Sequence, residues 1–371
     1  DEAHNASADV EATTRCFFEL FRKGWIRPKA MKNRGEVLQH LTEVLNEPVK
    51  GIGLKHLNLK EASRRLDELA KTAAKPLMKF KDVDEEILIK APFVHLHTHS
   101  QYSVLQSTST INDLVKTAAN DQMSAVSLTD HSNLMGAFYF IKAIKKHNAD
   151  LTEGVTPLKP ILGCEFYVCD NHQDRSRRDN GYQIVFIAKN KKGYENLSKM
   201  SSIANTQGFY YVPRIDKNVV EKYKSDLIVL TGNLYGEIPS KILNLGENQA
   251  EEALNWWYEQ FGEDLYIELM RHNQEDEKRA NQVLLKFGQK YAIKVLATNN
   301  SYYTTKAEAN AHDILLCVKE GEKQATPIGH GRGYRFGFPN HEYYFKSQAE
   351  MKSLFSDLPE AIINIQEVID K

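Results

Sequence analysis

The chain has 371 residues, of which 42% are hydrophobic and 26% charged, and its formal net charge is −1. Such a composition is typical of a soluble globular protein of about two or three domains, and the small net charge excludes a general electrostatic attraction to nucleic acid or membranes. The sequence contains neither 18 consecutive apolar residues nor a signal peptide. The four cysteines form no Cys-x-x-Cys pair, so we expect reduced thiols in a cytoplasmic protein.

The first 91 residues are predicted to be helical. Residues 8–24 (ADVEATTRCFFELFRKG) place apolar side chains near one helical face, and residues 58–74 (NLKEASRRLDELAKTAA) repeat this pattern. The chain opens within the first of these helices and lacks a starting methionine, so we expect it to be a piece of a longer polypeptide. We divide the chain into a first helix (1–25), a helical linker region (26–91) and a domain over 92–371.

Beyond Pro92 apolar runs alternate with helical patterns, for example at 111–121, 248–262 and 276–291. Strand–helix alternation of this kind predicts an α/β domain with a parallel sheet, either open or closed into a barrel. The seven predicted strands are 93–99, 124–131, 159–168, 182–190, 226–232, 264–272 and 293–300.

The first of these strands, FVHLHTH, carries histidines at positions 95, 97 and 99. Side chains two residues apart share one face of a strand, so His97 and His99 form a pair that could hold a metal ion. The alternative interpretation is a half-buried strand with polar residues facing solvent.

Other potential metal ligands fall at the ends of other predicted strands: His131 ends the second, Glu165 lies late in the third, and His272 ends the sixth. In α/β barrels and open sheets the carboxyl ends of the strands form the active-site face. The pattern therefore predicts that His97, His99, His131, Glu165 and His272 converge on an active or ancestral metal site.

Several segments in this order resemble the PHP domain (polymerase and histidinol phosphatase) of bacterial DNA polymerase III alpha subunits. They include HLHTHSQYSVL, AVSLTDHSNLMGA, PILGCEFYV, ELMRHNQEDEKRANQVLL, VLATNNSYY and YYFKSQAEMKSLFSDLPEAI. The resemblance covers about residues 92–365 and implies a distorted seven-stranded β/α barrel. It also implies that the chain is cut from a replicative DNA polymerase that acts with DNA and replisome subunits, and whose polymerase domains follow Lys371.

The N-terminus, HNASADVEATTRCFFEL, resembles the last motif of epsilon-like proofreading exonucleases of the DEDDh family. In that family the histidine, here His4, is the general base, and the aspartate, here Asp9, binds metal. The other carboxylates of such a site are absent, so the resemblance implies the incomplete end of an exonuclease fused ahead of the polymerase. The alternative is an ordinary helix start.

Members of the PHP family with an intact site hold three metal ions on nine ligands. The resemblance implies that this chain keeps five of them and departs at four, which are Gln106, Gln183, Asn300 and Tyr302. At these positions carboxamides and a phenol replace carboxylates and imidazoles, so nothing there would offset the repulsion between clustered cations. We expect no tightly bound metal, or at most one zinc, manganese or magnesium ion, since three protein ligands and water suffice for zinc.

The functional expectation is a structural PHP domain of a replicative polymerase, in contact with the other polymerase domains and the fused exonuclease. The alternative is an active metal-dependent phosphoesterase or 3′–5′ exonuclease. A free-standing histidinol phosphatase is disfavoured, because residues 343–362 resemble the polymerase branch of the family.

Overall fold

The structure of the protein is a computed structural model that describes residues 85–371 except 153, 154 and 330, together with residues 13, 16, 17, 19, 20 and 23. Internal contacts divide the chain into two compact units, Asp1–Lys75 and Pro76–Lys371. In the first unit, Thr13, Cys16, Phe17, Glu19 and Leu20 are helical. His4, Asp9 and nearly all of the predicted linker region lie outside the described residues, so the predictions for them stand as predictions.

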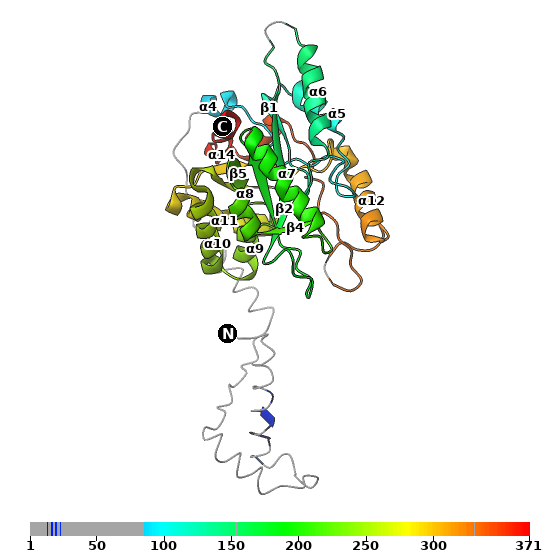
Figure 1. Ribbon diagram of the computed structural model, residues 1–371, viewed down its shortest axis with the longest axis vertical. Coiled ribbons are helices and arrows are strands. Elements are labelled where there is room, and N and C mark those ends of the chain that lie inside the picture. The colour runs from blue at the N-terminus through cyan, green and yellow to red at the C-terminus, as the bar shows by residue number, and fades with distance from the viewer. Residues whose placement is uncertain are drawn as a thin grey trace. The chain divides into compact units, whose positions relative to one another are not determined.

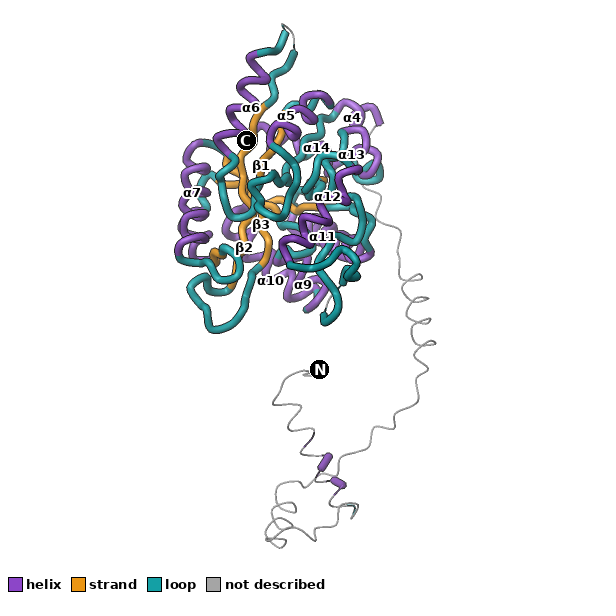
Figure 2. Tube along the Cα trace, turned by 90° about the vertical axis from the view of Figure 1, so that its right-hand side faces the viewer, coloured by secondary structure: helices purple, strands orange, loops and turns teal. Residues whose placement is uncertain are grey.

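The second unit is built around a mixed sheet of seven strands, whose hydrogen-bonded order is β1-β2-β3-β5-β6-β7, with β4 paired to β2. The sheet curls, and helices cover it on several sides (Figures 1 and 2). The predicted α/β barrel class is confirmed. The strands are β1 Ala125–Leu128, β2 Lys159–Cys169, β3 Tyr182–Ala188, β4 Arg214–Asp216, β5 Leu227–Leu230, β6 Leu265–Leu269 and β7 Val295–Ala297.

The prediction of an all-parallel sheet is wrong at β3, which runs antiparallel to both β2 and β5. The reason is the connection: residues 170–181 form a loop without a helix, and a chain that turns back directly pairs antiparallel. The reversed direction places the first residues of β3, including Gln183, beside the carboxyl-terminal half of β2, where Tyr167 is the partner of Gln183.

The first predicted strand is also different, because residues 93–99 are irregular apart from one bridge, between Thr98 and Ser301. The sheet still has seven strands, because it includes β4, which the sequence did not predict. The segment 95–99 nevertheless joins the two ends of the sheet by backbone hydrogen bonds. On the β1 side they are Ser127 N to His95 O and Thr129 N to Thr98 O, and beyond β7 they are His99 N to Ser301 O and Ser301 N to His97 O.

The helices pack apolar faces on the sheet. In α5 (Ile111–Asn120), for example, the Thr110 hydroxyl caps the first turn by accepting from Asp113 N, and four apolar side chains are buried. The others are α4 Glu85–Lys90, α6 Ala137–Ala149, α7 Lys191–Thr206, α8 Lys217–Tyr223, α9 Glu237–Asn244, α10 Glu247–Phe261, α11 Glu275–Tyr291, α12 Ala309–Glu320, α13 Gln348–Leu354, α14 Glu360–Ile363 and α15 Ile365–Asp370. Two 3₁₀ turns complete the unit, η1 Gly262–Asp264 and η2 Lys306–Glu308.

The predicted boundary at residue 92 stays a prediction, although α4 already belongs to the second unit. Leu88 of α4 packs against the core, and Lys352 of α13 donates to the Ile89 carbonyl oxygen. The three cysteines of this unit are buried as free thiols.

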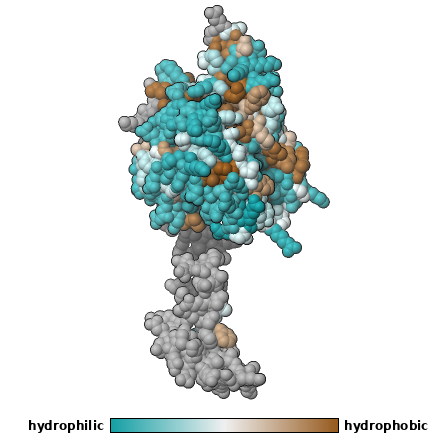
Figure 3. Space-filling view, in the orientation of Figure 1, coloured by the Kyte–Doolittle hydropathy of each residue, from teal (hydrophilic) through white to brown (hydrophobic). Residues whose placement is uncertain are grey.

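The surface of the described residues is mostly hydrophilic, with hydrophobic side chains gathered on the side where α6 and α12 lie (Figure 3). Phe138 of α6, and Ile314 and Val318 of α12, are exposed there. Among the helices of the described residues, none is both long and apolar enough to cross a lipid bilayer.

Candidate metal centre

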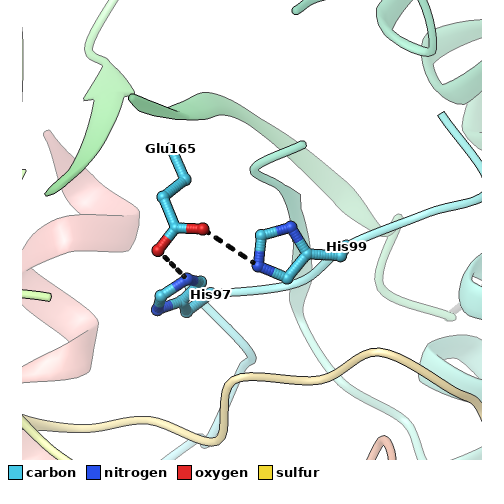
Figure 4. Close-up of side chains that lie close together, drawn as sticks. All are labelled: His97, His99 and Glu165. Atoms are coloured by element: carbon cyan, nitrogen blue, oxygen red, sulfur yellow. Dashed lines mark ion pairs between the residues drawn. The ribbon is translucent and has the colours of Figure 1, made fainter. Parts of the chain in front are cut away.

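Two histidines and one glutamate lie together at the closure of the sheet. His97 and His99 come from the irregular segment between β1 and β7, and Glu165 comes from the middle of β2 (Figure 4). All three side chains are fully buried, and one potential ligand atom from each lies within 4.8 Å of the other two. The sequence prediction that these three residues converge agrees with this geometry.

Glu165 is the central carboxylate of the cluster. Its Oε1 lies 3.2 Å from His97 Nε2, and its Oε2 lies 3.5 Å from His99 Nε2 and 2.8 Å from His131 Nδ1. Burial alone would raise the pKa of Glu165, but the neighbouring His131 and His97 outweigh it and hold the pKa well below its usual range. Glu165 is therefore an anion in the interior.

His131 follows β1 and joins this cluster from the side. Its ring stacks on that of His99 at a centroid distance of 4.2 Å, and its Nε2 lies 3.2 Å from the Tyr302 hydroxyl. Tyr302 also stacks on His99, at 4.4 Å. The phenol therefore occupies space beside the histidines and contacts two of them.

His272 is paired with a carboxylate of its own and is not among the three residues whose potential ligand atoms lie within 4.8 Å of one another. Its Nδ1 lies 2.6 Å from Glu277 Oε1, at the start of α11, and its ring stacks on Tyr343 at 4.1 Å. His272 instead lines a cavity of about 530 Å³, and all four of the positions that depart from the family pattern line it too, namely Gln106, Gln183, Asn300 and Tyr302.

The hydrogen bonds of these four neutral side chains involve an amide, a phenol, an imidazole and a lysine. Gln183 Oε1 accepts from Asn233 Nδ2 at 2.8 Å, and the same Asn233 amide lies 3.3 Å from Glu165 Oε1. Asn300 Nδ2 is 3.5 Å from the Tyr302 hydroxyl. Gln106 Oε1 accepts from Lys319 Nζ at 3.3 Å.

Sequence reasoning missed Glu268, a buried carboxylate in β6. Its Oε1 accepts from the Thr298 hydroxyl at 2.6 Å and lies 2.8 Å from His97 Nδ1. Asp130 was also missed, and it accepts from the Ser100 and Ser103 hydroxyls beside His99. The available signal was an acidic residue inside an apolar run, as in LYIEL, because an unpaired charge is costly in a buried strand.

Glu268 changes the electrostatics of the cluster. Burial opposes protonation of His97, but the Glu268 and Glu165 carboxylates outweigh it and raise the pKa of His97 to about 10. His99 behaves differently: burial and the neighbouring His131 lower its pKa well below the usual value, although Glu165 acts in the opposite sense. One histidine of the pair is therefore favoured as a cation and the other as a neutral base.

The buried polar atoms of the cluster test whether a metal ion fits. His97 Nε2, His99 Nε2, His131 Nδ1 and Glu165 Oε2 are buried without a hydrogen-bond partner among the described residues. They lie at ion-pair distances from one another, but not at hydrogen-bonding angles. Buried polar atoms are rarely left unpaired, and a cation between the two imidazoles and the carboxylate would satisfy them. The residues fit one ion with three protein ligands.

The same residues do not fit a cluster of ions. Several divalent cations close together need anionic oxygens that bridge them, and the four neutral side chains at the cavity supply none. The geometry thus defines a buried site suited to one cation, next to a cavity at which the four departing positions contribute three amides and a phenol.

Comparisons with known proteins agree with the fold. Residues 95–272 match the PHP domain family. A two-domain protein from Bacteroides vulgatus with a predicted PHP-like metal-dependent phosphoesterase aligns at a TM-score of only 0.38 and 12% identity, over 63% of this chain and 56% of that one.

Within that family the chain is a homologue of DNA polymerase III subunit alpha. It is 37% identical to the subunit from Borreliella burgdorferi over 76% of this chain, and 34% identical to that from Campylobacter jejuni over 75%. The subunit from Thermus aquaticus is 36% identical over 73% of this chain. The aligned part is 24%, 23% and 21% of these relatives, so the chain spans about a quarter of their length.

Proposed function

We propose that this chain is the PHP part of a longer bacterial replicative polymerase, and that the whole protein is a DNA-directed DNA polymerase, a nucleotidyltransferase. The support is the homology to DNA polymerase III alpha subunits over three-quarters of the chain. The partners under this proposal are DNA, the remaining polymerase domains and replisome subunits, in the cytoplasm.

Within that protein the PHP barrel serves as a structural domain and does not hydrolyse phosphodiesters. The observation that carries this proposal is the cavity beside Glu165, because Gln106, Gln183, Asn300 and Tyr302 all line it. A hydrolytic centre of two or three metals would need charged ligands there to offset repulsion between the ions. Neutral side chains that form hydrogen bonds at these positions instead stabilise the barrel as a scaffold.

The barrel still has the residues for one cation, which His97, His99 and Glu165 would hold, with His131 beside them. Zinc suits two imidazoles and a carboxylate, whereas manganese or magnesium would need more oxygen ligands. When bound, the ion would neutralise Glu165 and join segment 95–99 to β2. Its role under this proposal is to stabilise the fold.

Proofreading in this proposal belongs to an exonuclease fused ahead of the barrel. Its last helix supplies His4 and Asp9, which would be the general base and a metal ligand in an intact site. The support is the sequence motif alone, since both positions lie outside the described residues. With proofreading supplied in this way, a nuclease activity of the barrel would be dispensable.

The test is the metal content of the dialysed chain, followed by phosphodiesterase assays with added Zn²⁺ and Mn²⁺. We expect at most one ion per chain and no turnover. Two or more tightly held ions, with turnover lost in His97→Ala but kept in the control His341→Ala at an exposed histidine, would establish the alternative of an active phosphoesterase.

A further inference from the structure

Glu268 is a buried carboxylate with an arrangement of its own. It lies within β6, where the other four residues are apolar or aromatic and buried, and its relative exposure is 2%. A buried anion is costly unless it is paired. All of its pairing is made by one oxygen. Oε1 accepts from Thr298 Oγ1 at 2.6 Å and lies 2.8 Å from His97 Nδ1. The other oxygen, Oε2, has no hydrogen-bond partner among the described residues.

This contact determines which nitrogen of His97 is available. An ionised carboxylate only accepts hydrogen bonds, so Nδ1 of His97 carries a hydrogen that it donates to Glu268. Nε2 is then the nitrogen that can give up its proton and offer a lone pair to a cation; it faces Glu165 at 3.2 Å and has no hydrogen-bond partner among the described residues. A metal-binding histidine typically has this arrangement, in which a carboxylate behind the ring fixes its tautomer and its orientation.

His99, the second histidine of the cluster, has a similar arrangement, in which Ser103 lies between the ring and a carboxylate. His99 Nδ1 lies 3.2 Å from Ser103 Oγ, and Ser103 donates to Asp130 at 2.7 Å, so His99 also keeps its hydrogen on Nδ1. His272 donates through Nδ1 to Glu277, but it is not one of the three residues within 4.8 Å of one another. Glu277 is therefore a matched reference: a buried carboxylate behind a histidine, outside the cluster.

Glu268 also restores charge balance for one ion. Among the three residues that would touch a cation, Glu165 alone is anionic, which leaves a divalent ion with one uncompensated charge. Glu268, behind His97, supplies the second negative charge without occupying a ligand position. The barrel can thus lose carboxylates at its cavity and still hold one divalent ion.

We propose that Glu268 is a positioning residue that orients His97 Nε2 toward a single cation held with His99 and Glu165, and that supplies the second compensating charge. This inference rests on the single-ion site of the proposed function.

The test compares Glu268→Gln with Glu277→Gln in the full chain, by competition of Zn²⁺ with a chelating indicator and by visible absorption with Co²⁺. Loss of an outer carboxylate typically weakens metal affinity about 10–100-fold, so we expect that loss in Glu268→Gln, with a shifted and weaker Co²⁺ spectrum. Glu277→Gln should keep the wild-type affinity and spectrum. Equal losses in both variants, or no change in Glu268→Gln, would overturn the assignment.

A second variant guards against misfolding. Thr298→Val removes the hydroxyl that holds Glu268 but keeps the charge, so its affinity should fall between those of wild type and Glu268→Gln when near-ultraviolet circular dichroism is unchanged. A wild-type chain that binds neither Zn²⁺ nor Co²⁺ would overturn this inference and leave the scaffold proposal intact. Hydrolysis with two or more bound ions would instead overturn the scaffold proposal, while the Glu268 comparison would still decide the inference.

Discussion

The buried cluster and the cavity beside it differ in how their polar groups are matched. In the cluster, His97 lies between the carboxylates of Glu165 and Glu268, and the ion-pair contacts join imidazoles to anions. At the cavity, the amides of Gln183 and Asn233 bond to each other, and Asn300 contacts the Tyr302 phenol. The two regions adjoin through Asn233, which contacts both Glu165 and Gln183.

This difference teaches that the number of cations a site holds depends on the placement of charge more than on the number of polar groups. The cluster keeps its opposite charges in contact, so one ion can replace a proton there. The cavity has many donors and acceptors but no anionic oxygen among the four departing positions. Those four positions therefore contribute no charge that would balance a second or third divalent ion.

The largest change in metal binding should come from adding charged and imidazole side chains at the cavity. Replacing Gln106, Gln183, Asn300 and Tyr302 by Asp, His, Asp and His should raise metal uptake from at most one ion to two or more per chain. The variant adds two carboxylates to the cavity lining, so without metal it should also lose ~1–3 kcal/mol of its free energy of unfolding. Elemental analysis after dialysis and urea unfolding in chelator measure the two effects.

The control for this variant carries the same four changes together with Glu165→Gln, which removes the central carboxylate. Its uptake should fall to that of the unmodified chain or lower. If the fourfold variant takes up no additional metal, the assignment of these four positions to the family's ligand pattern is wrong.

A smaller effect concerns the pH dependence of the free energy of unfolding, through His312. Burial lowers the pKa of His312, although its hydrogen bond to the Gln106 carbonyl oxygen at 2.8 Å and the nearby Asp313 act in the opposite sense. The unfolded state, with an ordinary pKa near 6.5, then binds the proton more readily. The stability due to neutral His312 is therefore complete above about pH 6.5 and is lost as the pH falls toward the folded-state pKa.

Urea unfolding of wild type and His312→Gln in chelator, at pH 7.5 and 5.5, measures this contribution. Wild type should lose more stability on acidification than the variant, by less than about 1.4 kcal/mol per pH unit. Identical pH dependence in the two proteins would show that His312 titrates normally.

The smallest effect should follow from Tyr302→Phe. This change removes the hydroxyl that lies 3.2 Å from His131 Nε2, but it keeps the ring that stacks on His99. The expected cost is about 1 kcal/mol, typical of one hydrogen bond, with metal uptake unchanged. Urea unfolding measures the cost, and His341→Ala serves as the exposed control. A loss of metal binding would mean that the phenol itself holds the ion.

The convergence of His97, His99, His131 and Glu165 could be predicted because strand ends in α/β folds meet at one edge, so position in the sequence implies position in space. Glu268 could not be placed, since a single acidic residue in an apolar run does not indicate which neighbour it pairs with. The direction of β3 was missed because it depends on the connection after β2, where a loop replaces the helix expected there. The contact between Gln106 and Lys319 joins residues far apart in the sequence, so the sequence does not indicate it.

The irregular segment 95–99 also has a consequence for folding. Its hydrogen bonds reach β1 on one side and Ser301 on the other, so they form only after nearly the whole domain has been brought together. Contacts between residues so distant in sequence are slow to form, because the entropy of closing the chain is lost before they contribute. The pair His97 and His99 is therefore assembled late, and a bound cation would favour only molecules that have completed the barrel. The rate of metal uptake during refolding would therefore report the rate at which the barrel closes.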